Sequence, residues 1–150
     1  MGGVMAVVLK AGDQLQPVTH EVTNDKMIEF EKCVWDRGRN SHSDINAAKA
    51  DGIQRTIASG QNQMAFLHEL MELNFGDAWV YGGKISVRYI HPVYAGDHLT
   101  ATGLVTAVGE ADGKPRVELQ LWCENQDGRK TSAGTASAGQ PADARSWIKQ

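Results

Sequence analysis

The sequence predicts an α+β fold in which a curved antiparallel sheet wraps around one long apolar helix. Two observations lead to this prediction. A stretch from Gly60 or Gln61 to about Asn74 has a helical pattern that is apolar over most of its surface, so this helix must be covered on nearly all sides. The second half of the chain has the pattern of successive strands separated by turn dipeptides. A single curved sheet can bury such a helix.

Length and composition favour a small self-sufficient unit. The chain has 150 residues, of which 41% are hydrophobic and 22% charged, and its formal net charge is −3. We expect one domain over residues 1–150, with an N-terminal extension at 1–11 and a loose tail at 139–150. Because there is no basic excess, we expect no binding to nucleic acid or to an anionic membrane. The apolar run at 4–9 is too short to span a membrane and is interpreted as a tail or an edge strand.

A strand and a helix are expected near the N-terminus. Residues 15–22 alternate in polarity, which predicts a strand with Val18 and Val22 on one face. Thr23 or Asn24 can then cap a helix over residues 25–34. The helical spacing predicts that Met27, Phe30 and Val34 face inward, with Cys33 as a further candidate.

A polar loop and a short helix follow. Residues 35–43 are too rich in Gly, Asn and Arg for either regular period, so we expect a loop. Ser43 or Asp44 then starts a short helix over residues 45–49, which Asp51-Gly52 ends. Residues 53–59 have no regular pattern.

The long helix comes next. Its apolar residues cover most of its surface and are Met64, Ala65, Phe66, Leu67, Leu70, Met71, Leu73 and Phe75. A narrow polar stripe remains at Gln61, His68, Glu69 and Glu72.

Four strands are expected after the long helix, at residues 84–90, 99–108, 116–124 and 130–138. Asp112-Gly113 and Asp127-Gly128 are hairpin signals, which predict an antiparallel meander. The sequence alternates apolar residues 117, 119 and 121 with residues 118, 120 and 122, so one face of the sheet is expected to be buried.

Three stretches of the sequence resemble a known family. They are His42-Ser43-Asp44 followed by Ala47 or Ala48 and Gly52, then Ile57-Ala58-Ser59-Gly60, and then Ile90 to Asp97 with the sequence IHPVYAGD. In order and spacing they are similar to H-x-D then A then G, I-A-H-G and F-x-x-P-V-x-x-G-D of the MaoC-like dehydratases and (R)-specific enoyl-CoA hydratases. This family has the hot-dog fold, a curved sheet around one helix. The resemblance extends over roughly residues 12–138.

The resemblance implies catalytic residues in the loop before His42. In the family, an Asp and a His in the pattern D-x-N-P-x-H activate water for addition to an enoyl thioester. Here the loop is Asp36-Arg37-Gly38-Arg39-Asn40-Ser41-His42, without the proline. His42 corresponds to the family's histidine. Asp36, one residue too far away, would be its partner if the loop bulges, whereas Asn40, one residue too near, would instead orient His42.

The resemblance also implies that substrate binds at the start of the long helix. Ser59 stands in place of the family's histidine, and Gln61 follows the glycine where an apolar residue is common. Gly60 would supply an N–H for the enolate oxygen, because the positive end of the helix dipole lies behind it and it has no side chain to hinder the thioester.

Other interpretations of these residues remain open. His42 has an unperturbed pKa of about 6.5, which suits proton transfer in both directions, but it could also cap the short helix. Asp44 is expected to be an N-cap rather than a base. We expect His68 to make a hydrogen bond in the core rather than line a pocket, and we assign no function to the remaining histidines, His20, His91 and His98.

Several other chemistries lack their motifs. Gly82-Gly83-Lys84 does not have phosphate-loop spacing, no G-x-G-x-x-G is present, and Ser59 is not in a G-x-S-x-G elbow. Histidines and cysteines show no metal-ligand spacing. We therefore expect no cofactor and no metal. Cys33 and Cys123 lie far apart and form no C-x-x-C pair, which favours a cytoplasmic protein with free thiols.

Three functions are compatible with the sequence. The first is a cofactor-independent hydratase or dehydratase acting on an acyl thioester of coenzyme A or a carrier protein. The second is an acyl-CoA thioesterase, although Glu69 and Glu72 lie late in the helix rather than in its first turn. The third is a non-catalytic or repurposed acyl-binding protein, as the altered loop suggests. Because a single hot dog leaves a sheet edge open, we expect a homodimer or a dimer-based oligomer.

Overall fold

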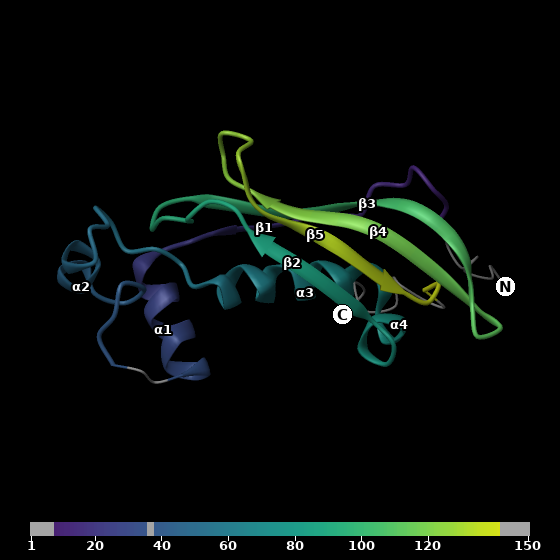
Figure 1. Cartoon of the computed structure of the whole chain (residues 1–150), viewed down its shortest axis with the longest axis horizontal. Helices are drawn as coiled ribbons and strands as arrows, with labels where there is room; N and C mark the ends of the chain where they lie inside the picture. Colours follow the sequence, from purple (N-terminus) through teal and green to yellow (C-terminus); the bar gives the residue numbers. More distant parts are fainter. Residues whose placement is uncertain (1–7, 36–37, 142–150) are drawn as a thin grey trace, which may run out of the picture.

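The computed structural model describes residues 8–35 and 38–141. Its elements follow in the order β1 (Val18–Glu21), α1 (Asn24–Val34), α2 (Ile45–Ala50), α3 (Gly60–Phe75), α4 (Asp77–Val80), β2 (Lys84–Tyr89), β3 (His98–Ala111), β4 (Lys114–Glu124) and β5 (Lys130–Ala138). The strands form one antiparallel sheet that lies over α3 (Figure 1). The predicted fold class, a curved antiparallel sheet with one long helix, is confirmed.

The strand order corrects one prediction. In space the strands follow the order β1-β3-β4-β5-β2, so β3, β4 and β5 form a meander, but β2 pairs with β5 at one edge of the sheet. The predicted hairpins are present. Between β3 and β4, Asp112 and Gly113 have φ of 53° and 74°, the positive values that a two-residue hairpin turn requires. In the β4–β5 turn, Gly128 has φ of 72°.

The core lies between α3 and the inner face of the sheet. Leu67, Leu70 and Met71 of α3 are 0% exposed, and the alternating residues Val117, Leu119 and Leu121 of β4 are at most 1% exposed. The polar stripe predicted for α3 is also confirmed, because the exposed residues of this helix are Gln61, His68, Glu69 and Glu72. We call α3 and the sheet the sheet–helix core.

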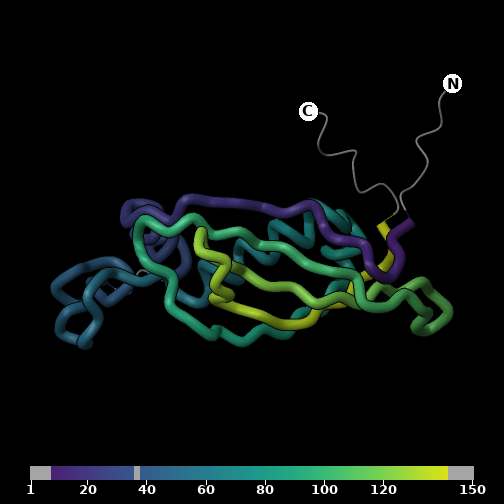
Figure 2. The backbone as a smooth tube through the Cα atoms, turned by 90° about the horizontal axis from the view of Figure 1, so that it is seen from above, coloured from purple at the N-terminus to yellow at the C-terminus, as the bar shows by residue number. Residues whose placement is uncertain are grey.

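Residues 24–35 and 38–59 lie mainly beyond one end of the sheet, where α1 and α2 are seen at the left of Figure 1 and Figure 2. We call them the projecting segment. Both of its helices begin as predicted. Thr23 caps α1 by accepting the N–H of Lys26, and Asp44 caps α2 by accepting the N–H groups of Asn46 and Ala47. Asp44 is thus an N-cap, and these hydrogen bonds lower the pKa of its carboxyl.

The buried face of α1 differs from the prediction. Met27 and Glu31 are buried, whereas Val34 is 38% exposed and Phe30 only half-buried. Residues three, four and seven positions after Met27 can all share its face of a helix, and in the structure it is Glu31, four positions on, that faces inward with Met27. The short helix α4, directly after α3, was not predicted from the sequence. Among the described residues, no helix is long and apolar enough to cross a membrane.

Candidate active site

His42 is fixed by two hydrogen bonds, one to its backbone and one to its ring. Its backbone N–H donates to Oδ1 of Asn40 at 2.8 Å. Its Nδ1 lies 2.8 Å from the backbone oxygen of Ile57. A carbonyl oxygen can only accept, so Nδ1 carries a proton and Nε2 of the neutral ring has a free lone pair. Asn40 therefore holds the loop at His42, and Ile57 sets the orientation and tautomer of the ring.

Ile57 joins the loop of His42 to the start of α3. Its N–H donates to the oxygen of Ser41 at 3.2 Å, while its own oxygen accepts from His42. The next residue, Ala58, donates to the oxygen of Val93 at 2.8 Å. Because α3 begins at Gly60, three residues after Ile57, these bonds place the imidazole beside the chain that leads into the helix.

The start of α3 has a side-chain cap and a glycine. The Ser59 hydroxyl accepts the N–H of Asn62, so Ser59 is the N-cap and is buried. Gly60 is the first helical residue, a position at which the backbone N–H has no acceptor within its own helix. Gln61 is exposed. Of the three residues that the sequence suggested here, Ser59 therefore caps α3, Gly60 has a backbone N–H that can donate to a ligand, and Gln61 has an exposed side chain.

The backbone of Gly60 has a close neighbour, the ring of Tyr89. A Cβ added to Gly60 would lie 2.7 Å from Cε2 and 2.9 Å from Cζ of Tyr89. Tyr89 is on the edge strand β2 and its side chain is about half exposed. Sequence patterning did not identify Tyr89, since a tyrosine in a strand is usually a packing residue and its contact with Gly60 depends on the tertiary fold.

A row of polar side chains lies under the first turns of α3. Tyr89, Ser132 and Cys123 are cross-strand neighbours on β2, β5 and β4. Thr131 donates to Oε1 of Gln63 at 2.9 Å, and Gln63 is 3% exposed. Burial raises the pKa of the Cys123 thiol to about 11 and also raises that of the Tyr89 hydroxyl. Both groups are therefore protonated near neutral pH.

The other sequence candidates lie elsewhere or have other roles. Asp36 is outside the described residues. His68 is exposed and lies beside Trp79, with ring centroids 5.3 Å apart, so the predicted core hydrogen bond is wrong. His20 does have a partner, because its Nε2 lies 2.6 Å from Oε2 of Glu69. His91 contacts Arg129 at 3.1 Å.

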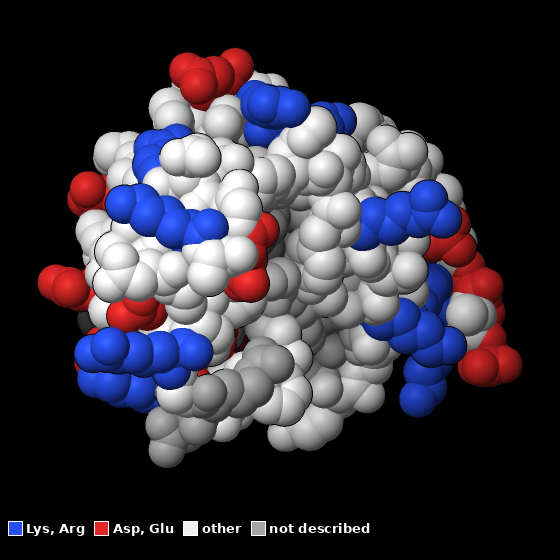
Figure 3. All heavy atoms as spheres, turned by 60° about the vertical axis from the view of Figure 1, so that its left-hand side comes forward, with Lys and Arg blue, Asp and Glu red and all other residues white. Residues whose placement is uncertain are grey.

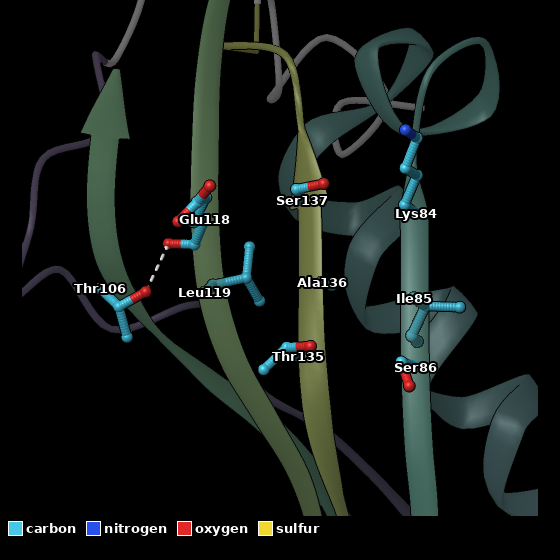
Figure 4. A pocket seen from close by; sticks show the side chains of 9 residues that line it. All are labelled: Lys84, Ile85, Ser86, Thr106, Glu118, Leu119, Thr135, Ala136 and Ser137. Carbon is cyan, nitrogen blue, oxygen red and sulfur yellow. Dashed lines mark hydrogen bonds between the residues drawn. The ribbon is translucent and has the colours of Figure 1, made fainter. Parts of the chain in front are cut away.

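The surface is hollowed in several places. Figure 3 shows the end of the molecule that carries the projecting segment, with Lys and Arg side chains on both sides of a hollow. One pocket of about 350 Å³ lies between α1 and the loop of His42, lined by Glu31, Arg39, Ser43 and Asp44 among others. Another of about 390 Å³ lies on the sheet, where Lys84, Glu118 and Ser137 project from neighbouring strands (Figure 4). Neither His42 nor Gly60 lines this sheet pocket, so we do not assign catalysis to it.

No metal site is evident in the described part of the chain, where no three His, Cys, Asp or Glu side chains gather in a position to hold an ion. Cys33 is exposed and Cys123 is buried, and both are free thiols. His42 and Gly60 themselves bring an imidazole and a backbone N–H donor, groups that serve acid–base catalysis and the stabilisation of an oxyanion.

Comparisons with known proteins agree with the fold. The family model described as "MaoC like domain" matches residues 11–127. No curated protein matches the chain. The (R)-hydratase PhaJ1 of Pseudomonas aeruginosa is a similar solved structure, with a TM-score of 0.71 and 23% identity over 89% of this chain and 83% of that one.

Two further solved structures are similar in fold. The (R)-hydratase of A. caviae involved in PHA biosynthesis has a TM-score of 0.73 and 22% identity, covering 89% of this chain and 98% of that one. The HadBC (3R-hydroxyacyl-ACP dehydratase) complex of Mycobacterium tuberculosis includes a chain with a TM-score of 0.64 and 21% identity, covering 85% of this chain and 95% of that one. At these identities the likeness establishes the hot-dog fold.

Proposed function

The chain belongs to the MaoC-like domain family, and from this premise we propose that it adds water to, or removes water from, the double bond of an enoyl thioester. The thioester is one of coenzyme A or of a carrier protein. The observation that carries the proposal is the bond from Nδ1 of His42 to the oxygen of Ile57, at 2.8 Å. It fixes the orientation of the imidazole against Ile57, three residues before Gly60 at the start of α3.

In the proposed reaction, His42 acts as the base. Its Nε2 takes a proton from water, and the water oxygen bonds to the β-carbon of the enoyl group. The electron pair of the double bond moves toward the thioester carbonyl, which becomes an enolate oxygen. The imidazolium then returns its proton to the α-carbon, so the product gains the elements of one water. Dehydration follows the same steps in reverse.

Gly60 is proposed to stabilise the enolate oxygen. Its N–H is at the N-terminus of the 16-residue helix α3, where the helix dipole favours negative charge. The hydrogen bond from an N–H that is already oriented toward this oxygen becomes stronger as negative charge develops on the oxygen. Ser59 and Gln61 are proposed to lie on either side of the bound thioester. Ser59 fixes the backbone at the start of α3 as its N-cap, and Gln61 has an exposed side chain that can contact the thioester.

Asn40 and Asp36 are proposed as the residues that support His42. The bond from the His42 N–H to Asn40 supports an orienting role for Asn40. Asp36 would contribute a carboxylate that holds the attacking water. The altered register of this loop makes His42 the residue on which the reaction most depends.

We further propose that two chains form a homodimer through the edge strand β2. One side of β2 pairs with β5, and no strand of the described residues pairs with its other side, which could pair with a second sheet. Large apolar side chains are exposed next to this strand, with Tyr81 at 85% and Ile90 at 48% exposure. Sedimentation should give a mass near twice the 16.3 kDa of one chain, and a stable monomer would contradict this proposal.

Two variants of His42 test the proposed reaction. His42→Ala removes the whole imidazole, whereas in His42→Asn the side-chain amide N–H takes the place of the Nδ1–H and can still donate to the oxygen of Ile57, without a basic nitrogen. We expect both to lower kcat/KM for crotonyl-CoA by about 100-fold to 10,000-fold, the usual contribution of a general base. Loss of absorbance of the enoyl thioester measures the reaction.

The comparison of these two variants separates catalysis from structure. Full activity in His42→Asn would show that the ring has a structural role only. Release of free thiol without hydration would instead favour a thioesterase, for which α3 offers no acidic residue in its first turn and Glu69 pairs with His20. Binding of the thioester without any turnover would favour an acyl-binding protein.

A further inference from the structure

A further pocket shares the residue Ile57 with the proposed active site. Its volume is about 550 Å³, within the usual range for small-molecule sites. Its walls come from two separate stretches, residues 52–57 and residues 92–94, and the lining side chains include Ile53, Gln54, Arg55, Ile57, Pro92 and Tyr94. We call it the Arg55 pocket.

The walls of the Arg55 pocket are joined by backbone contacts. Ala58 donates to the oxygen of Val93 at 2.8 Å, and Ala95 donates to the oxygen of Thr56 at 3.3 Å. Ile57 and Tyr94 also form an antiparallel bridge. Because Val93 is fully buried in the core, these bonds attach both walls to the rigid part of the molecule.

Arg55 provides the positive charge of this pocket. The centre of its guanidinium lies 4.4 Å from the centroid of the Tyr94 ring, so the side chain is stacked on an aromatic face. Within the described residues no carboxylate forms an ion pair with it. A stacked guanidinium that has no acidic partner retains its N–H donors for a phosphate or carboxylate.

Ile57 belongs both to the Arg55 pocket and to the site of His42. Its side chain lines the pocket, and its backbone oxygen accepts from Nδ1 of His42. The apolar residues Ile53, Ile57 and Pro92 line the same pocket as Arg55. A ligand that reaches from the reacting thioester into this pocket would therefore be an extended chain that ends in an anion, with apolar side chains and Gln54 along its length.

We propose that the Arg55 pocket binds the 4′-phosphopantetheine arm of the thioester, with the guanidinium of Arg55 donating to the phosphate. This inference rests on the proposed function and adds to it the place where the carrier is recognised. The pantetheine chain lies along Ile53, Ile57 and Pro92. Because coenzyme A and acyl carrier proteins share this arm, the same contact serves both sources.

The test compares thioesters that differ only in their carrier. Crotonyl thioesters of coenzyme A, of 4′-phosphopantetheine and of pantetheine without phosphate are assayed with the full-length wild type and with Arg55→Gln. We expect Arg55→Gln to raise KM about 10-fold for the two phosphorylated substrates, as for the loss of one charge-assisted hydrogen bond. The KM for the pantetheine thioester and kcat for all three should be unchanged.

Lys49→Gln is the matched control. Lys49 is an exposed cation on α2 that does not line the pocket, and its replacement makes the same change in net charge. An equal rise in KM in both variants would show general electrostatic attraction and would overturn the proposal. A rise for the coenzyme A thioester alone would place the nucleotide, rather than the shared arm, at Arg55, and would also overturn it.

A binding measurement separates this inference from the proposed function. If no thioester is turned over by the wild type, the proposed function fails. Calorimetry with 4′-phosphopantetheine then tests the pocket by itself, where about 10-fold weaker binding in Arg55→Gln than in Lys49→Gln supports the inference. Equal binding to the two variants, or none to the wild type, overturns it.

Discussion

The sheet–helix core and the projecting segment differ in what holds them together. In the core, apolar side chains from α3 and the strands pack against one another, with Leu70, Met71 and Phe75 at most 1% exposed. In the projecting segment, the order comes largely from caps and hydrogen bonds, such as that from Thr56 Oγ1 to Asn24 Oδ1 at 3.0 Å. The residues proposed for catalysis lie where these two regions meet.

This difference suggests separate roles for the two regions, rigidity for the core and orientation of His42 for the projecting segment. Apolar packing is insensitive to direction but fixes α3 and the sheet as a rigid base. Hydrogen bonds are directional, and those at Asn40 and Ile57 set the orientation of His42. The proposed reaction depends on the orientation of one imidazole. The projecting segment supplies that imidazole, and the sheet–helix core supplies the N-terminus of α3.

Removing a large side chain from the core should give the largest loss of stability. Leu70 is 0% exposed in the middle of α3, so Leu70→Ala leaves a cavity. We expect the free energy of unfolding to fall by about 2–5 kcal/mol, measured by urea denaturation. Ile45→Ala, at a position 41% exposed on α2, is the control and should change stability by less than about 0.5 kcal/mol. Similar losses in the two variants would contradict the contrast between the regions.

The same division explains what could be predicted from the sequence. The polar stripe of α3 and the caps at Thr23 and Asp44 were predicted correctly, because each depends on residues close together in the sequence. The position of β2 beside β5 was not, since strand order depends on contacts between distant segments.

For the site as well, the sequence predicted local motifs but not contacts between distant residues. Motif resemblance drew attention to His42 and Gly60, but the bond from His42 to Ile57 joins residues 15 apart in the sequence. The ring of Tyr89 on Gly60 joins two different elements. Neither leaves a periodic signal, so only the structure reveals them.

A variant at the junction tests whether core and segment are coupled there. Gly60→Ala would bring a methyl group to within 2.7 Å of the Tyr89 ring, so one of them must move. Because Tyr89 is about half exposed and its ring can turn outward, we expect a moderate loss of about 1–2 kcal/mol in unfolding free energy. Thermal or urea unfolding measures it.

A double-mutant cycle assigns that loss to the contact. In a Tyr89→Ala background, Gly60→Ala should cost at least about 0.5 kcal/mol less than in the wild type. If the two changes are additive, the cost arises from the backbone of the helix start and not from the ring. The close contact would then not be the reason for glycine at this position.

The smallest expected effect concerns Glu31, the buried acid of α1. Glu31 is 4% exposed, and both its carboxylate oxygens are buried without a hydrogen-bond donor among the described residues. Such a group costs free energy, so Glu31→Met, which has similar volume, should raise the free energy of unfolding by about 1 kcal/mol. Glu29→Met on the exposed side of α1 is the control, with a change within about 0.5 kcal/mol.

Both outcomes at Glu31 are informative about the projecting segment. A loss of stability in Glu31→Met would show that the carboxylate has a donor in solution, so that this segment is held by one more polar contact. A gain in stability combined with a fall in kcat/KM would show that the protein retains a costly buried carboxyl group next to the loop of His42 because the reaction needs it. A gain with unchanged activity would leave the buried acid as a site where the segment can be stabilised without altering catalysis, and the hydrogen bonds at Asn40 and Ile57 would then suffice to orient the imidazole.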